Sequence, residues 1–129
     1  MTDADRPRVS SGSPYEAPIG FSRAMRIGDR IVVAGTAPVW PDGEVDPDPG
    51  AQAARCLSII TEALAALGAS PSDVVRTRMY LTNPTDWEAV GHAHGAVFGD
   101  IRPASTMVVV SALLDPRWKV EIEAEAIIG

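Results

Sequence analysis

The amino-acid sequence predicts a two-layer α/β (α+β) sandwich, in which two helices pack on one face of a mixed sheet. Apolar residues recur every three or four positions over 51–67 and again over 86–98, which is the period of two amphipathic helices. Over 118–127 they alternate with polar residues, which is the period of a strand buried on one face. Shorter apolar runs add further strands, so the predicted order is β-β-α-β-α-β-β. Since each helix has one apolar stripe, both should cover the same face of the sheet.

Composition and charge limit the class of protein. The chain has 129 residues, 46% of them hydrophobic and 22% charged, as expected for one globular domain. Its 17 acidic and 11 basic residues give a net charge of −6, which argues against a nucleic-acid partner. No apolar run approaches the roughly 20 residues of a membrane-spanning helix, and no signal peptide is recognisable. The single cysteine fits a reducing compartment. We therefore expect a cytoplasmic protein with no membrane partner.

The N-terminal part divides into a tail and a hairpin. Residues 1–14 contain proline, glycine and serine without apolar periodicity, which predicts a flexible tail before a single domain over 15–129. Ordered structure should begin near Ile19. The segments 22–27 and 30–34 flank a Gly-Asp pair and are predicted to form a β-hairpin.

The two helices carry start and stop signals. Asp48 is placed to cap the first helix, and Gly68 to end it. Thr85 and Glu88 have the spacing of a capping box at the start of the second helix. Cys56 lies on the apolar stripe of the first helix, which favours a buried structural thiol over a nucleophile.

The strand predicted over 74–82 has an unusual polar face. Arg76 and Arg78 share one face with Tyr80, while Thr77 belongs to the opposite one. Two interpretations stay open from the sequence. The arginines either belong to a solvated face or contact an anion or carboxylate.

The C-terminal run contains the most apolar strand. Met107–Val110 is continuously apolar, which is typical of a strand covered on both faces. Turn residues separate it from 118–127, so we expect the two strands to form an antiparallel hairpin. Because the helices cover only one sheet face, the apolar strand also predicts an interface between subunits.

One row of side chains on the last strand could carry chemistry. Glu121, Glu123 and Glu125 share a face, and they either form a solvated row or include a general acid or base with a raised pKa. Phosphate-binding loops and nucleophile elbows are absent from the sequence. His92 and His94 point about 200° apart on a helix and cannot share one ion, so no metal is expected.

The ordered motifs along the chain resemble those of the RidA (YjgF-type) family over about residues 13–128. The segments that carry the resemblance are Gly20–Ala24, Arg26–Gly35, Asp73–Thr77, Ile101–Met107 and Val120–Ala124. The resemblance implies a chorismate-mutase-like fold and a homotrimer with ligand clefts between subunits. It also implies hydrolysis of reactive enamines or imines to keto acids and ammonia, without a cofactor, with Glu121 positioning the water.

The resemblance also assigns a binding site, with one departure. Family members grip the substrate carboxylate with an arginine at the position that Ser105 occupies here, so this chain resembles an arginine-lacking branch. The remaining substrate-binding positions are Phe21, Ala34, Gly35, Thr106, Met107 and Arg102. A serine hydroxyl donates one neutral hydrogen bond, whereas a guanidinium donates a charged pair of them. Losing the charge-assisted contact costs about 1.5–3 kcal/mol of binding free energy. Arg76, Arg78 and Arg102 are the candidates to compensate.

Two other functions are open to the sequence. The same cleft could serve a non-enzymatic metabolite-binding protein or a chaperone-like protein, since the scaffold is kept while the arginine is lost. Ribonuclease activity, which has also been attached to the family, fits poorly with the net charge of −6 and with the lack of a suitable histidine pair.

Overall fold

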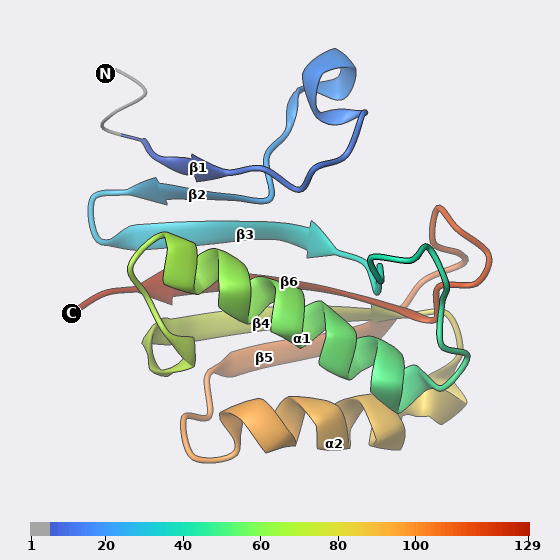
Figure 1. The fold of residues 1–129 in the computed structure, drawn as a ribbon. Coiled ribbons are helices and arrows are strands. Elements are labelled where there is room, and N and C mark those ends of the chain that lie inside the picture. Colours follow the sequence, from blue (N-terminus) through green and yellow to red (C-terminus); the bar gives the residue numbers. More distant parts are fainter. Residues whose placement is uncertain (1–5) are drawn as a thin grey trace.

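The computed structural model describes residues 6–129. They form one six-stranded sheet and two long helices (Figure 1). The strands are β1 (Arg8–Val9), β2 (Ala24–Ile27), β3 (Arg30–Thr36), β4 (Val74–Leu81), β5 (Ala104–Val109) and β6 (Val120–Ile127). The helices are α1 (Pro49–Ala66) and α2 (Trp87–Phe98), with short helical turns η2 (Glu16–Gly20), η3 (Pro71–Asp73) and η4 (Pro84–Asp86).

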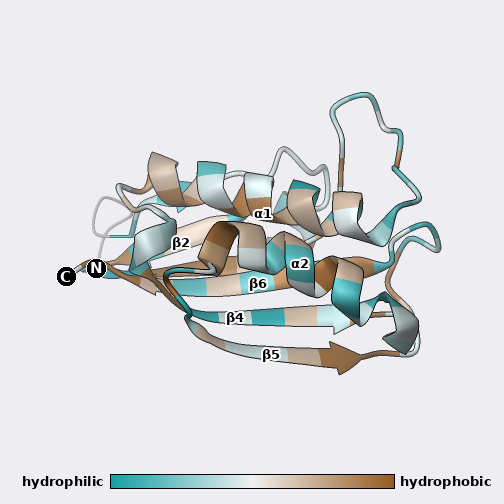
Figure 2. Cartoon of the chain, turned by 90° about the horizontal axis from the view of Figure 1, so that it is seen from below, coloured by the Kyte–Doolittle hydropathy of each residue, from teal (hydrophilic) through white to brown (hydrophobic). Residues whose placement is uncertain are grey.

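The predicted two-layer architecture is confirmed. Both helices lie side by side over the same sheet face, and the view along the layers shows one layer of helices above one layer of strands (Figure 2). Burial on β6 follows the predicted alternation, with Val120, Ile122, Ala124 and Ala126 each 2% exposed or less. The glutamates between them therefore lie on the face turned away from the helices.

The local signals of α1 are confirmed. The Asp48 side chain accepts a hydrogen bond of 2.8 Å from the backbone N–H of Ala51, and Pro49 is the first helical residue. The chain leaves the helix through Gly68, whose φ of 87° suits glycine.

The start of α2 differs from the prediction. The Asn83 side chain caps the short turn η4 by accepting a hydrogen bond of 3.0 Å from the backbone N–H of Thr85. The predicted Thr85–Glu88 capping box is therefore wrong. The side chain of Trp87, the first residue of α2, is 57% exposed. Pro84 starts the 3-10 turn before the α-helix, and this changes which residue caps the chain.

The expected C-terminal hairpin is wrong. β5 pairs with β4 alone, in parallel, and β6 lies between β3 and β4, antiparallel to both. The helix α2 carries the chain back, so the strand after it enters parallel to β4, as in a βαβ unit. β5 is consequently an edge strand. Val108 and Val109 are 42% and 51% exposed. A single chain therefore does not provide the cover on both faces of this strand that the apolar run predicted.

Ordered structure begins earlier than Ile19. Arg8 and Val9 pair with β2, and the turn η2 follows before the confirmed β2–β3 hairpin. Residues 1–5 of the predicted tail lie outside the described residues. Within residues 6–129 no helix is long and apolar enough to cross a membrane.

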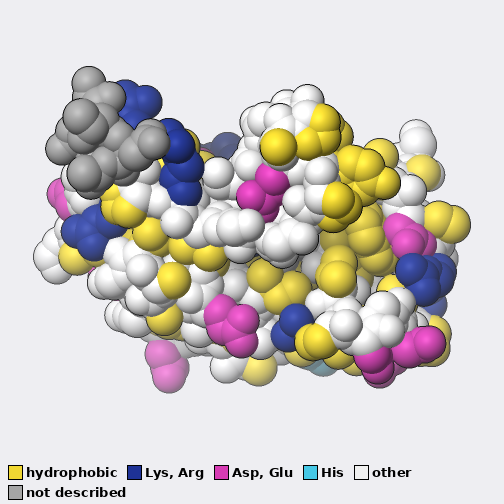
Figure 3. Space-filling model, turned by 45° about the horizontal axis from the view of Figure 1, so that its top comes forward, with side chains coloured by type: hydrophobic (Ala, Val, Ile, Leu, Met, Phe, Trp, Pro, Cys, Tyr) yellow, Lys and Arg dark blue, Asp and Glu magenta, His cyan; other side chains and the backbone are white. Residues whose placement is uncertain are grey.

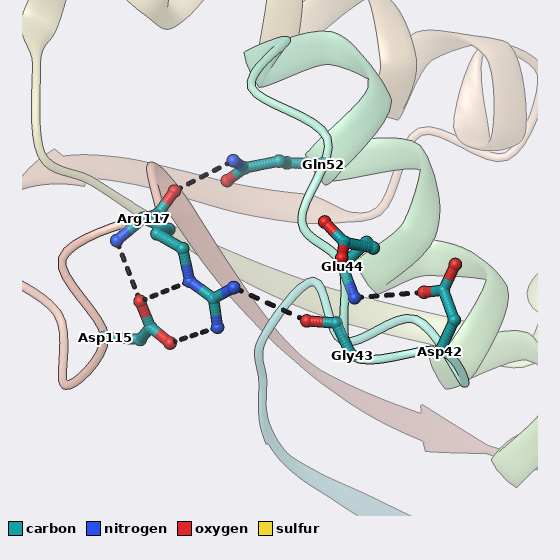
Figure 4. A network of polar contacts seen from close by, with 6 residues as sticks. All are labelled: Asp42, Gly43, Glu44, Gln52, Asp115 and Arg117. Atoms are coloured by element: carbon teal, nitrogen blue, oxygen red, sulfur yellow. Dashed lines mark hydrogen bonds and ion pairs between the residues drawn. The ribbon is translucent and has the colours of Figure 1, made fainter.

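A buried glutamine fixes the start of β6. Gln52 of α1 is fully buried and donates a hydrogen bond of 3.0 Å to the carbonyl of Arg117. Its carbonyl accepts one of 2.8 Å from the backbone N–H of Lys119. Arg117 in turn contacts Asp115 and the carbonyl of Gly43, which joins the loop before α1 to the loop before β6 (Figure 4). These contacts hold the strand that carries the glutamate row.

Candidate active site

Glu121 lies half-buried against a bulge in the neighbouring strand. The register between β3 and β6 shifts between Val33 and Thr36, and Gly35 sits in that irregular stretch. A Cβ atom at position 35 would lie 2.6 Å from Oε2 of Glu121, closer than real contacts allow. The glycine is therefore what makes room for the carboxylate.

Arg23 approaches the same glycine. Its Nη1 donates hydrogen bonds of 2.9 Å to the carbonyl of Gly35 and 2.8 Å to Oγ1 of Thr36. Thr36 is fully buried and donates to the carbonyl of Ala34 at 2.8 Å, which fixes the orientation of its hydroxyl. A cation and a carboxylate thus converge on Gly35. Of the ion pairs between residues 6 and 129, none joins them directly.

The charges of the two groups act on each other. Burial raises the pKa of Glu121, the positive charge of Arg23 opposes that rise, and the neighbouring Glu123 adds to it. Burial lowers the pKa of Arg23, and Glu121 opposes this. A desolvated carboxylate whose pKa is raised is a suitable general base near neutral pH.

The other two glutamates of the row are paired. Oε1 of Glu123 accepts hydrogen bonds of 2.5 Å from the Tyr80 hydroxyl and 3.3 Å from Arg78. Glu125 pairs with Arg30 at 2.9 Å and with Arg78 at 3.6 Å. Of the two interpretations that the sequence left open for the arginines of β4, contact with carboxylates is the correct one for Arg78. The row is therefore structural except at Glu121.

The proposed compensating arginines lie elsewhere. Arg76 is opposite Glu125 and Arg78 opposite Glu123, whereas the residue opposite Glu121 is Tyr80. Arg102 is exposed in the connection before β5, with a φ of 57°. Within this chain, the arginine that interacts with Glu121 is Arg23.

The structure divides the predicted site residues into two groups. Ala34 and Gly35 are on β3, where Gly35 lies against Glu121, and Phe21 follows η2 just before β2. Ser105, Thr106 and Met107 are on β5, with β4 between them and β6. Two strand spacings amount to about 10 Å. The hairpin expected from the sequence would have placed these strands side by side, so its failure is what separates the groups.

Ser105 belongs to a polar chain that the sequence did not reveal. Oγ1 of Thr77 donates a hydrogen bond of 2.8 Å to Oγ of Ser105 and lies 2.8 Å from Nε2 of His94. The donor and acceptor in the second bond depend on the tautomer of His94. Burial lowers the pKa of His94, and its ring packs 4.7 Å from that of Phe98. Ser105 thus keeps its own hydrogen for another acceptor.

An open hollow is lined by residues of β2, β3 and the segment before β2. Its volume is about 680 Å³, and Phe21 and Ala34 are among its lining residues. Ser22 and Ala24, the neighbours of Arg23 in the chain, line it as well. In the view with this end of the molecule turned forward, hydrophobic side chains gather at the upper right, around the segment that carries η2 (Figure 3). The hollow could hold the apolar part of a small molecule.

The buried position of Cys56 fits a structural thiol. Residues 6–129 contain no group of three potential metal ligands among their His, Cys, Asp and Glu side chains. Cys56 is fully buried, and burial raises the pKa of its thiol to about 12. The structural role predicted for this cysteine fits both observations.

Arg23 and Thr36 are the site residues that sequence reasoning missed. Arg23 stands inside a quoted segment, Gly20–Ala24, but no local pattern marks it as a partner of a glutamate nearly one hundred positions away. One signal in the sequence is Gly35 itself, since a glycine within a strand often marks the close approach of another group. What approaches is the pair Arg23 and Glu121.

The comparisons with known proteins define the class. Residues 13–128 match the family model described as Endoribonuclease L-PSP. The chain is similar to the crystal structure of Rv2704 from Mycobacterium tuberculosis, a member of the YjgF/YER057c/UK114 family, with 46% identity, a TM-score of 0.87, and 95% and 99% of the two chains covered. These matches confirm the chorismate-mutase-like fold and the α+β class.

Two further relatives, one uncharacterized and one named as a deaminase, are similar over most of their length. The chain is 41% identical to the uncharacterized protein SCO2049 of Streptomyces coelicolor, with 100% of this chain and 97% of that protein covered. It is 33% identical to the 2-iminobutanoate/2-iminopropanoate deaminase of Escherichia coli K12, over 83% of this chain and 86% of that one. The chain belongs to the RidA (YjgF-type) family, as the sequence motifs predicted.

Proposed function

We propose that this protein hydrolyses the C=N bond of a small imine, or of the enamine from which it forms, and releases a carbonyl compound and ammonia without a cofactor. The observation that carries the proposal is the state of Glu121. It is the glutamate of its row for which residues 6–129 provide no direct ion pair, it is half-buried, and burial raises its pKa. The similarity to the Escherichia coli deaminase supports the same chemistry.

The reaction can be written with Glu121 as the base. The imine enters with its nitrogen protonated. The Glu121 carboxylate takes a proton from a water molecule while the water oxygen bonds to the imine carbon, and the C=N electron pair moves to nitrogen, which gives a neutral carbinolamine. Glu121 then returns this proton to the nitrogen, and the C–N bond breaks as the hydroxyl oxygen forms the C=O bond. The hydroxyl proton passes to Glu121 and from it to the released ammonia. The sum is protonated imine plus water giving carbonyl compound plus ammonium.

We further propose that the active form is a homotrimer with its clefts between subunits. Two features of one chain support this. The strand β5, which carries the predicted binding residues, is two strand spacings, about 10 Å, from β6 with β4 between them, and a neighbouring subunit could supply the missing half. The exposed Val108 and Val109 give the edge strand an apolar surface for such contact. Native mass spectrometry would report the number of subunits. The proposal includes a cytoplasmic location.

The deciding experiment compares two carboxamide variants. Ammonia release from freshly generated 2-iminobutanoate and 2-iminopropanoate is measured for wild type, Glu121→Gln and Glu125→Gln. We expect Glu121→Gln to lose about 100-fold or more in rate, and Glu125→Gln to stay within about threefold because its partners are structural. Equal rates for wild type and Glu121→Gln would refute the role of Glu121.

Ser105 favours one alternative, a metabolite-binding or chaperone-like protein with the same cleft. Such a protein would show ligand-dependent thermal shifts, or suppression of aggregation of a client protein, without ammonia release. Those results for wild type would replace the hydrolase proposal.

A further inference from the structure

If the substrate of the proposed reaction is an imino acid, a positively charged group is needed to bind its carboxylate. Ser105 is neutral, and its oxygen already accepts a hydrogen bond from Thr77. Arg78 is committed to Glu123 and Glu125, and Arg76 lies opposite Glu125, not Glu121. None of these groups offers a positive charge beside the proposed base.

The geometry points to Arg23 as the substrate-binding residue that receives a carboxylate, with Glu121 beside it facing the imine end of the same molecule. This inference rests on the proposed function, since it names the substrate class of that reaction. The substrate would be a small 2-imino acid, or an equivalent compound with a carboxylate next to the C=N bond.

The hydrogen bonds of Arg23 leave a binding edge. Both bonds to protein atoms use Nη1, which holds the guanidinium on Gly35 and Thr36. Among the described residues, Nε and Nη2 have no hydrogen-bond partner. Those two nitrogens form one edge of the planar guanidinium, and their spacing matches the two oxygens of a carboxylate. The anchored end also lowers the entropy lost when a ligand binds.

The surroundings fit a zwitterionic ligand. Arg23 and Glu121 both approach Gly35 and act on each other electrostatically, so a molecule with a carboxylate and a protonated imine would find one complementary charge for each end. Phe21, Ala34 and the chain neighbours of Arg23 line an open hollow at β2 and β3. A short apolar side chain of the substrate could lie there.

The test separates charge recognition from folding and from turnover. Wild type, Arg23→Gln and Arg23→Lys are assayed at pH 8 with 2-iminobutanoate and with an uncharged imine of similar size. Arg78→Gln is the matched control, since it removes an arginine that holds only structural carboxylates. Thermal unfolding and circular dichroism verify that each variant is folded.

We expect Arg23→Gln to raise KM for the imino acid by about 10- to 100-fold, because a charge-assisted pair of hydrogen bonds is lost. The kcat/KM for the uncharged imine should stay within about threefold of the wild-type value. Arg23→Lys should lie between, and would replace Arg23→Gln if that variant did not fold. Unchanged KM for the imino acid in a folded variant would overturn the assignment, as would an equal loss for both substrates.

Failure of the proposed function can be told from failure of this inference. Binding of the product analogues 2-oxobutanoate and butanone is followed by ligand-detected NMR, which needs no turnover. If wild type hydrolyses neither imine but binds the oxo acid, and Arg23→Gln loses that binding, the hydrolase proposal fails and the carboxylate site stands. If the oxo acid binds both proteins equally, the carboxylate site is refuted.

Discussion

Glu121 and Glu123 stand two residues apart on the same face of β6, and the structure treats them differently. Glu123 is held by the Tyr80 hydroxyl at 2.5 Å and by Arg78 at 3.3 Å. Glu121 lies against a glycine, and Arg23, whose charge acts on it, donates its hydrogen bonds to the carbonyl of Gly35 and to Thr36 instead. The comparison teaches that a row of like side chains can serve stability at most positions and leave one member available for chemistry.

Among changes that would remove the special position of Glu121, Gly35→Ala is expected to have the largest effect on activity. The new Cβ would lie 2.6 Å from Oε2 of Glu121, so the carboxylate must move. A displacement of about 1 Å at a reacting group costs about 100-fold in rate. We expect that loss in kcat for imine hydrolysis, with a folded protein.

The matched control is Gly91→Ala on α2, where an added Cβ meets nothing within 4 Å. That variant should keep wild-type kcat and gain slightly in stability. A Gly35→Ala variant with full activity would mean that the position of Glu121 does not matter for the reaction.

The second prediction concerns the pH dependence of activity. Glu121 must be ionised to take a proton, and burial raises its pKa. Activity should therefore fall with decreasing pH at a higher pH than an ordinary carboxylate would give. Arg23 opposes the rise, so Arg23→Gln should move this acid limb to still higher pH. The acid limb of wild type and that of the variant are both measured from the pH dependence of kcat/KM for an uncharged imine. A shift of this limb toward lower pH in Arg23→Gln would contradict a favourable interaction between Arg23 and the Glu121 carboxylate.

The smallest effects are expected in stability, with opposite signs at the two glutamates. Glu123→Gln weakens partly exposed contacts to Arg78 and Tyr80, which should cost about 0.5–1 kcal/mol of unfolding free energy. Glu121→Gln removes a desolvated charge and should raise the unfolding free energy at pH 7. Urea unfolding followed by circular dichroism measures both.

The sign for Glu121 follows from linkage. Its folded-state pKa is raised, so the stability that the protonated carboxyl provides is fully present below the unfolded pKa and is lost as pH rises through the folded pKa. The advantage of Glu121→Gln over wild type should therefore shrink as the pH is lowered toward 4. An advantage independent of pH would indicate a cause other than the desolvated charge.

Much of the fold could be predicted because its signals are local. The helical period over 51–67, the cap at Asp48 and the alternation along β6 each depend on residues close together in the chain, and all three were confirmed. The N-terminal strand β1 could not be predicted, since two residues carry no period and their pairing partner lies in β2.

Strand order was the part that local patterns could not supply. β5 and β6 are neighbours in sequence, and the turn residues between them favoured a hairpin. In the sheet β4 lies between them, because α2 returns the chain to the start of β4 and makes β5 its parallel partner. Which strands pair is a competition among distant segments for the same edge of a sheet.

The sequence by itself therefore determined the class of fold, the family and Glu121 as the candidate base, because periods and ordered motifs are written along the chain. Only the tertiary structure decided that Arg78 is committed to Glu123 and Glu125, that Ser105 is joined to His94 through Thr77, and that Arg23 meets Glu121 at Gly35. Charge pairing and desolvation depend on distance in space, and residues remote in sequence become neighbours only once the strands have assembled.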